Sequence, residues 1–389
     1  MTPTLAPSDA YSNDFQSHQE MPMTPVLAPF RADHVGSILR PNSLKAARAL
    51  RQQRAWSAEH LRNVEDQAII DVIAKQESLG LRSITDGEFR REFWHFDFLS
   101  GLDGVELYQS ASGIRFKGAD TKPTSVRVSG KIGFTGHQMI EHFQFLKEHV
   151  HQAPKMTIPS PGVLHFRGGR ASIPESTYPE IEMFYHDLGN AYNKAVHAFA
   201  DAGCRYLQLD DTPFTYFCDA EQRRMLINRG DDPDQLPQAY AQMMNAAVAG
   251  GPADMLITMH LCRGNFKSLW IGEGGYEPVA ELLFNGVNVH GYFLEYDTER
   301  AGGFEPLRFV PKGKTIVLGL VTSKSGVLET KDALKRRIDE AAKFVPLDQL
   351  CLSPQCGFAS TEEGNILTED EQWAKLALVV ETAWEVWGD

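Results

Sequence analysis

The stretch Met259-His260-Leu261-Cys262-Arg263-Gly264-Asn265-Phe266 directly follows the apolar run Asp254-Met255-Leu256-Ile257-Thr258. The apolar run is typical of a buried β-strand, and the Gly and Asn that follow it are typical of a turn. His260 and Cys262 stand two positions apart where this strand ends, so both side chains can point into one cavity. Imidazole nitrogen and thiolate sulfur are ligands that zinc prefers. The pair indicates part of a metal site, although a strand end with a buried histidine and an inert thiol has the same pattern.

Strand-like runs of this kind alternate with helical patterns along most of the chain. Strands are predicted at 30–37, 81–85, 155–158, 205–209, 254–262, 287–294, 314–321 and 349–353. Apolar periodicity predicts helices at 44–54, 57–79, 178–202, 236–249, 277–284, 331–344 and 369–387. Eight strands that alternate with helices, without a domain linker between them, predict an α/β fold. The expected architecture is a single (β/α)8 barrel of the TIM type.

Two segments stand outside this alternation. Residues 101–136 alternate apolar and polar side chains, which predicts a β-hairpin insertion after the second strand. Residues 1–29 are rich in Ser, Pro, Gln and Asp and lack the basic-then-apolar layout of a signal peptide. We therefore expect a flexible leader at 1–29 and one barrel domain at 30–389.

Composition excludes several function classes. The 389 residues include 38 basic and 51 acidic side chains, which gives a formal net charge of −13. Because no long basic run is present either, we expect small-molecule substrates rather than nucleic acid or an anionic membrane as partners. Five cysteines are too few and too odd in number for a disulfide framework, so reduced thiols are expected. No apolar run approaches the roughly 20 residues of a membrane-spanning helix, and a cytoplasmic location is expected.

Ionisable and hydroxyl side chains follow nearly every predicted strand. In a β/α barrel the functional groups lie at the carboxyl ends of the strands. The residues found at those ends here are His34, Ser37, Asp86, Glu88, Ser160, Asp210, Asp211, His260, Cys262, Glu295, Ser323, Lys324 and Cys356. This pattern predicts an active-site rim, although strand ends are also polar where they meet solvent. Asp86 and Asp211 fit equally well as caps of the segments that follow them.

Several motifs together resemble the cobalamin-independent methionine synthase family, specifically its zinc-bearing C-terminal barrel and its shorter single-barrel homologues. The resemblance extends from about Phe30 to the end of the chain. It rests on His-x-Cys at 260–262, the Glu that closes the next strand at 295, Pro-x-Cys-Gly at 354–357, Asp-Gly-Glu at 86–88, Val-Gly-Ser at 35–37 and Leu-Asp-Asp at 209–211. Each motif is common by itself, but their combination is specific.

The resemblance implies zinc as the cofactor and homocysteine as the thiol substrate. The implied zinc ligands are His260, Cys262, Glu295 and Cys356. The positions that match the family's contacts to the amino and carboxylate groups of homocysteine are Gly36, Ser37, Glu88 and Asp210. A thiol that joins a zinc site is converted to a nucleophilic thiolate. The implied activity is methyl transfer from a folate-type donor to homocysteine, which gives methionine.

Two departures from the family concern the methyl donor. Full-length methionine synthase has a second, N-terminal barrel that helps to hold the polyglutamate tail of its folate, and this chain has no room for one. The family has a catalytic His in an Asp-x-His-Ser sequence after the seventh strand, where this chain reads Thr322-Ser323-Lys324-Ser325. Lys324 can donate a proton there, although an ammonium group is ordinarily a weaker acid than an imidazolium. Lys324 and Asp210 are therefore the candidate catalytic residues.

Other interpretations of these residues stay open. The resemblance extends to zinc enzymes that join coenzyme M to an epoxide. It also extends to enzymes whose methyl group comes from a carrier other than folate, such as a corrinoid protein. Carboxylates at 88 and 210 favour the ammonium group of an amino acid over a sulfonate. A barrel with a structural zinc and no turnover is a further alternative, and it predicts a closed four-ligand site. The aromatic segment 89–98, with Trp94 and His95, either shapes the donor pocket together with the insertion or provides core and lid packing.

Overall fold

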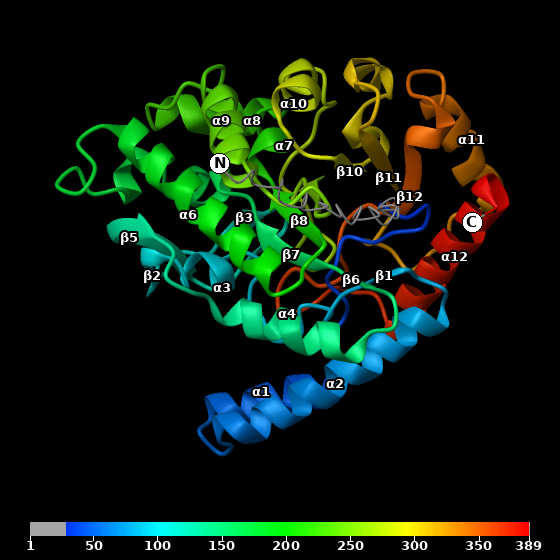
Figure 1. Cartoon of the computed structure of the whole chain (residues 1–389), viewed down its shortest axis with the longest axis horizontal. Coiled ribbons are helices and arrows are strands. Elements are labelled where there is room, and N and C mark those ends of the chain that lie inside the picture. The colour runs from blue at the N-terminus through cyan, green and yellow to red at the C-terminus, as the bar shows by residue number, and fades with distance from the viewer. Residues whose placement is uncertain (1–28, 389) are drawn as a thin grey trace, which may run out of the picture.

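The core of the molecule is a parallel β-sheet (Figure 1). The computed structural model describes residues 29–388. Six strands pair in parallel in the order β12-β11-β10-β9-β8-β7. Their bounds are β7 (Met156–Pro159), β8 (Tyr206–Asp211), β9 (Leu256–Leu261), β10 (Gly291–Glu295), β11 (Thr315–Val321) and β12 (Leu350–Pro354). Almost every residue of these strands is buried, as expected for a parallel sheet covered on both faces. The predicted α/β class is confirmed.

Two more segments extend this parallel arrangement. The short strand β1 (Ser83–Ile84) pairs in parallel with β6 (Ala153–Pro154), and β7 begins two residues after β6. Ala32 forms a parallel bridge to Leu352 of β12. The continuous strand expected at 30–37 is therefore wrong, because the structure has only this bridge there.

Side-chain hydrogen bonds replace the strand ladder after Ala32. Asp33 is fully buried and accepts hydrogen bonds from the Ser83 hydroxyl at 2.7 Å, the Lys155 ammonium at 3.1 Å and the Tyr206 hydroxyl at 2.7 Å. The chain then turns at Gly36, whose φ is +141°. A buried charge requires such partners, so this segment is fixed by polar contacts rather than by strand pairing.

Helices cover the sheet as predicted, with additions. The helices that match predicted segments are α1 (Asn42–Gln52), α2 (Ala58–Ser78), α6 (Ile181–Asp201), α9 (Leu236–Val248), α10 (Ala280–Gly286), α11 (Lys331–Ala341) and α12 (Glu369–Trp387). The helices that were not predicted are α3 (Phe96–Leu99), α4 (Gln138–His149), α5 (Gly162–Gly168), α7 (Pro213–Tyr216) and α8 (Ala220–Asn228). Short 3-10 turns occupy Arg170–Ser172, Glu299–Ala301, Glu305–Phe309 and Leu347–Gln349. Four of these helices have nine residues or fewer, which is too short for a clear periodic signal. α4 has 12 residues with buried Met139, Phe143 and Leu146 at helical spacing, so its pattern was present in the sequence but was not recognised.

The region 101–136 contains antiparallel strands. β2 (Asp103–Gln109) pairs with β5 (Thr124–Gly133), and β3 (Arg115–Phe116) pairs with β4 (Ala119–Asp120) between them. The β3–β4 turn reaches the loop that follows β9, where the Lys117 amide donates to the Trp270 carbonyl at 3.2 Å. The Phe116 and Phe266 rings lie 5.3 Å apart at the same place. This segment therefore lies against the loop that carries part of the predicted site.

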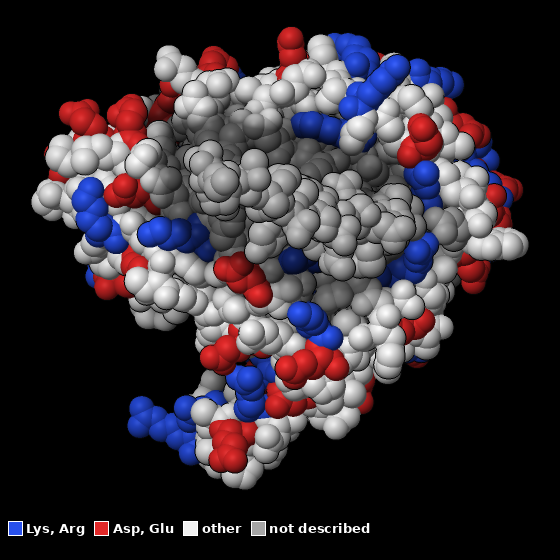
Figure 2. All heavy atoms as spheres, viewed as in Figure 1, with Lys and Arg blue, Asp and Glu red and all other residues white. Residues whose placement is uncertain are grey.

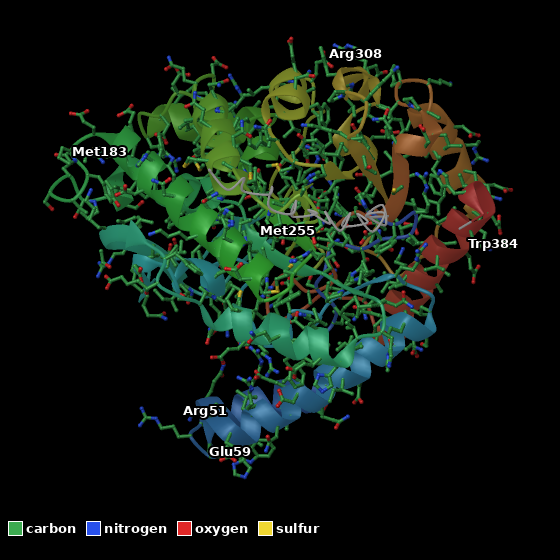
Figure 3. All side chains as sticks on the ribbon, viewed as in Figure 1. Arg51, Glu59, Met183, Met255, Arg308 and Trp384 are labelled. Atoms are coloured by element: carbon green, nitrogen blue, oxygen red, sulfur yellow. The ribbon has the colours of Figure 1, made fainter. Side chains whose placement is uncertain are left out.

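Among residues 29–388, no helix is both long and apolar enough to cross a lipid bilayer. On the face shown in Figure 2, acidic and basic side chains are interspersed. Arg51 and Glu59 project from the end of α1 and the start of α2, away from the body of the molecule (Figure 3). Apart from Pro29, the leader expected at 1–29 lies outside the described residues.

His137 caps α4 and is held neutral by the fold. Its Nδ1 accepts a hydrogen bond from the Met139 amide at 3.0 Å, and its Nε2 lies 3.0 Å from the Phe98 carbonyl oxygen. Burial lowers the pKa of His137 to about 4, although the carbonyl opposes this shift. Because the folded pKa lies below the ordinary value, His137 stabilises the fold fully above about pH 6.5, and this contribution is lost as the pH falls toward 4.

We expect His137→Asn to destabilise the protein less at about pH 5 than at about pH 7. The difference in the free energy of unfolding between wild type and variant is expected to be smaller by about 2 kcal/mol at the lower pH. The reason is that the wild-type ring resists protonation in the fold, whereas asparagine caps the helix at both pH values. Urea unfolding of both proteins at the two pH values measures this change. An unchanged difference would show that His137 is not held neutral.

Candidate metal centre and substrate pocket

Four potential metal ligands meet at the carboxyl edge of the sheet. His260 lies near the end of β9, Glu295 is the last residue of β10, and Cys262 and Cys356 lie just beyond β9 and β12. One ligand atom from each of the four lies within 4.8 Å of the others. All four residues are buried, and the two sulfur atoms are 3.4 Å apart. The structure therefore brings together residues that are up to 96 positions apart (260 to 356).

The contacts of these side chains fit a metal ion. Both ring nitrogens of His260 are buried without a hydrogen-bond partner. An unsatisfied buried polar group costs free energy, so a ligand for this ring is expected. Glu295 Oε1 accepts from the Arg263 amide at 2.9 Å, and Oε2 lies 3.3 Å from the Arg300 guanidinium. One nitrogen, two sulfurs and one carboxylate, fixed in this way, are a donor set suited to zinc.

Lys324 lies beside this cluster. Its ammonium group donates to the Gly264 carbonyl and to Asn265 Oδ1, both at 3.2 Å. Burial raises the pKa of Glu295, and the positive charge of Lys324 is the strongest effect opposing that rise. Asn265 in turn donates to the Gly357 carbonyl at 2.6 Å. The loops after β9, β11 and β12 are therefore connected around the cluster.

Two buried carboxylates, Glu88 and Asp210, face the same cavity as the cluster. Glu88 Oε1 accepts from the Thr157 hydroxyl at 2.8 Å, whereas its Oε2 is buried without a partner. Asp210 accepts from Gln208 at 2.7 Å. Burial raises the pKa of Asp210 to about 7; the charge of Glu88 adds to this rise, and that of His260 opposes it. Burial likewise raises the pKa of Glu88. Arg91 lies 3.5 Å from Glu88 Oε1 and compensates part of this negative charge, so the open Oε2 and Asp210 leave room for a further cationic group.

The backbone around Glu88 is held in a rare conformation. Glu88 has a φ of +61°, directly after Gly87 at +65°. The Asp86 carboxylate accepts from the Glu88 amide at 2.8 Å and so supports this turn. Strained backbone of this kind is often found where a side chain must be aimed at a ligand. Asp86 therefore caps the segment that positions Glu88, in agreement with the capping interpretation.

Asp211 is also a capping residue. One of its oxygens accepts at 2.9 Å from the amide of Phe214, in the first turn of α7, and the other accepts from the Ser160 hydroxyl at 2.5 Å. Burial raises the pKa of Asp211 to about 6. The neighbouring residues Asp210 and Asp211 therefore differ in their surroundings, and only Asp210 lines the cavity.

Ser37 lines the same cavity, and Gly36 directly precedes it in the chain. A Cβ at Gly36 would lie 2.7 Å from Cγ2 of Thr157, the residue that holds Glu88. The Ser37 hydroxyl accepts from the Ala359 amide at 3.2 Å, which leaves its own proton free to donate. A Cβ at Gly357 would lie 2.0 Å from that hydroxyl. Glycine at both positions thus permits close contact between the loops.

The shared cavity contains residues that the motifs did not reveal. It encloses about 30 Å³, and its lining includes Ser37, Glu88, Asp210, His260, Cys262 and Cys356 but not Gly36 or Glu295. Further side chains that line it are Trp94, Phe116, Arg167, Thr212, Tyr216 and Asn265. Trp94 belongs to the aromatic segment noted in the sequence, and Asn265 follows Cys262 in the turn. Arg167 and Tyr216 lie in α5 and α7, which no periodicity predicted.

Comparison with known proteins places this site in a family. The family model "Cobalamin-independent synthase, Catalytic domain" matches residues 30–384. The chain belongs to this family. The resemblance read from the motifs is thereby confirmed.

Several cobalamin-independent synthase relatives span nearly the same length. The uncharacterized protein YxjH of Bacillus subtilis (strain 168) is 54% identical over 362 residues, which are 92% of this chain and 95% of that protein. A crystal structure of a putative vitamin-B12-independent methionine synthase from Listeria monocytogenes has 46% identity and a TM-score of 0.76, and covers 93% of this chain and 99% of that one. A methionine synthase of Pyrococcus abyssi (strain GE5 / Orsay) is 24% identical over 326 residues, 83% of this chain and 84% of that protein. The family match at 30–384 therefore includes the strands of the sheet and the four residues of the cluster.

Proposed function

We propose that this protein is a zinc-dependent methyltransferase that transfers a methyl group from a folate-type donor to homocysteine and so forms methionine. The observation that carries the proposal is the buried cluster of His260, Cys262, Glu295 and Cys356, in which the imidazole has no other partner. Relatives of this chain are named methionine synthases, and these names identify the methyl-transfer reaction to be tested. When bound, zinc supplies the Lewis acidity that lowers the pKa of a substrate thiol.

We also propose that residues 30–389 form one catalytic (β/α)8 barrel with the antiparallel segment as an insertion after the second strand. Six paired parallel strands support this, as do the β1–β6 pair and the Ala32 bridge to β12. The remaining gap lies between the segment that follows Ala32 and the segment that follows β1. Contacts such as the hydrogen bond from the Ile38 amide to the Gly87 carbonyl, at 3.1 Å, connect these two segments. The metal cluster and the carboxylates then share the face where such barrels hold their active sites.

The amino-acid part of the substrate is bound by the residues beside the cluster. Glu88 and Asp210 receive the ammonium group, because two buried carboxylates with an open oxygen are stabilised by a cation. The Ser37 hydroxyl, which lines the same cavity, is placed to donate to the carboxylate. Together these contacts hold the substrate sulfur toward the cluster, and positioning of this kind accounts for a large share of a bimolecular rate.

The transfer itself moves one carbon and one proton. The thiol releases its proton, its sulfur attacks the methyl carbon, and the bond from that carbon to the donor nitrogen breaks. The electron pair of that bond stays on nitrogen, which takes up a proton. Lys324 is the candidate proton donor because it lies beside Glu295 and carries no ion pair of its own among the described residues. Asp210 acts with it by holding the substrate in place.

Glu88→Gln tests the homocysteine assignment. We expect the KM for homocysteine to rise roughly 30-fold with a smaller change in kcat, because a charge-assisted contact present in both ground and transition state is removed. Methionine formed from homocysteine and 5-methyltetrahydrofolate by the zinc-loaded chain is measured by mass spectrometry. Glu281→Gln, an exposed change on α10, is the matched control. No methionine from wild-type protein would overturn the reaction, and an unchanged KM would overturn the role of Glu88.

A further inference from the structure

Three segments of the chain meet around Arg40, and each of them carries a residue of the candidate site. Ser37 lies in the segment that leads to Arg40, Glu88 lies in the loop after β1, and Cys356 lies in the loop after β12. Arg40 itself is only 1% exposed and does not line the cavity that holds the site. Any effect of Arg40 on the site is therefore exerted through the segments that it contacts.

The guanidinium of Arg40 bridges the two loops with its two terminal nitrogens. Nη2 donates to the carbonyl oxygens of Glu88 and Arg91, at 2.8 and 2.9 Å. Nη1 donates to the carbonyl oxygens of Ala359 and Thr361, at 3.2 and 3.0 Å, in the loop after β12. A planar guanidinium holds its donors in a rigid fork. These four contacts to the main chain therefore set the separation of the two loops.

Backbone hydrogen bonds of the preceding segment join the same two loops. The Ile38 amide donates to the Gly87 carbonyl oxygen at 3.1 Å, directly before Glu88. The Phe358 amide donates to the Ser37 carbonyl oxygen at 2.9 Å, in the loop that carries Cys356. The segment 37–40 therefore contacts both loops along its length, and Arg40 adds the side-chain bridge.

Arg48 provides a second connection between the loops, nearer the surface. Its guanidinium donates to the Phe89 carbonyl oxygen at 2.6 Å and to the Glu362 carboxylate at 3.2 Å. Its contact to the second loop is through a side chain rather than through the backbone, so it fixes the separation less closely. With Arg48 in place, we expect the loops to stay folded but to move relative to one another when Arg40 is replaced.

We infer that Arg40 is a positioning residue that fixes the distance between the loops of Glu88 and Cys356 and thereby selects the length of the amino-acid thiol. This rests on the proposed function. The ammonium group of the substrate binds at Glu88, and its sulfur must reach the cluster that contains Cys356 at the same time. Homocysteine has two methylene groups between its α-carbon and its sulfur, whereas cysteine has one. With the loop separation fixed, cysteine cannot make both contacts, so the site distinguishes the two amino acids.

Isothermal titration calorimetry of homocysteine and of cysteine with the zinc-loaded full chain measures this selectivity. We expect wild type to bind homocysteine about tenfold or more tightly than cysteine, because cysteine gives up one charge-assisted contact. In Arg40→Met, homocysteine binding is expected to weaken about tenfold and cysteine binding to change less than about twofold, since cysteine does not span the two loops. Arg40→Lys is expected to behave similarly, because one ammonium group does not reproduce the fork that reaches both loops. Arg40→Lys also decides the outcome if Arg40→Met does not fold.

Arg31→Met is the matched control. The Arg31 guanidinium donates to the carbonyl oxygens of Asp348 and Leu350, at 2.9 and 2.7 Å, at the end of β12 opposite Cys356. This variant loses contacts of the same kind outside the site, so we expect it to bind both amino acids as wild type does. Zinc content is expected to stay at the wild-type level in every variant, and thermal unfolding of each variant establishes that it is folded.

The same titrations separate the inference from the function on which it rests. Equal affinity of wild type for homocysteine and cysteine overturns the inference. Unchanged selectivity in a folded Arg40 variant, or an equal loss of selectivity in Arg31→Met, overturns it as well. Loss of zinc from Arg40→Met would assign Arg40 to the support of the metal centre and also overturn it. Wild-type protein that binds no homocysteine overturns the proposed function instead.

Discussion

Cys356→Ser is expected to lower methionine formation by at least about 10³-fold. Cys356 contributes one of two sulfur ligands, and a serine hydroxyl is a far weaker ligand for zinc than a thiolate. The loss of one ligand also leaves His260 and Glu295 buried around an incomplete site. The rate of product formation at saturating homocysteine, measured on protein prepared with added zinc, gives the effect.

Cys218→Ala is the matched control for this loss. Cys218 is a half-buried thiol outside the cluster, and its sulfur lies 3.4 Å from the Phe214 carbonyl oxygen. We expect this variant to keep its activity. If Cys356→Ser kept most of its activity while Cys218→Ala lost it, the cluster would not be the reacting centre.

Lys324→Met is expected to lower kcat by about 10²-fold and to leave the KM for homocysteine and the zinc content unchanged. The departing nitrogen of the donor needs a proton in the transition state, and the ammonium of Lys324 is the candidate source. Its side chain also holds Gly264 and Asn265, so a purely structural role has to be distinguished. Steady-state kinetics of the variant provide the kcat and KM values.

Lys324→Arg makes that distinction. Arginine keeps the positive charge and the hydrogen bonds but does not give up its proton. We expect it to be nearly as slow as Lys324→Met, whereas a structural role would be rescued. Lys343→Met, an exposed change beyond α11, controls for the loss of a lysine charge. Full activity in Lys324→Met would show that another group protonates the donor.

The sequence predicted the long elements well because their patterns are local. α12 begins at Glu369 and ends at Trp387 as predicted, since its capping box with Thr368 and Glu371 can be recognised in the sequence. β10 begins at Gly291, whereas the strand was predicted from residue 287. The His290 amide donates to the Ile257 carbonyl at 2.8 Å, and the His290 ring Nδ1 accepts from the Ile257 amide at 3.0 Å, so contact with this neighbouring segment starts only at His290. Such contacts depend on a neighbour 33 residues away and leave no periodic signal.

Only part of the site could be predicted from local sequence patterns. His260 and Cys262 share one strand end, so their proximity follows from strand geometry. The positions of Glu295 and Cys356 followed from the family resemblance. The cavity residues Arg167 and Tyr216 could not be found this way, because they lie in the short helices α5 and α7, whose few residues give no periodic signal.

The most direct test is the zinc content of purified protein, measured by inductively coupled plasma mass spectrometry for wild type, Cys356→Ser and Cys218→Ala. We expect about one zinc ion per chain in wild type and in Cys218→Ala, and strong loss in Cys356→Ser. Wild-type protein without zinc after expression in zinc-supplemented medium, or full retention of zinc in Cys356→Ser, would contradict this expectation.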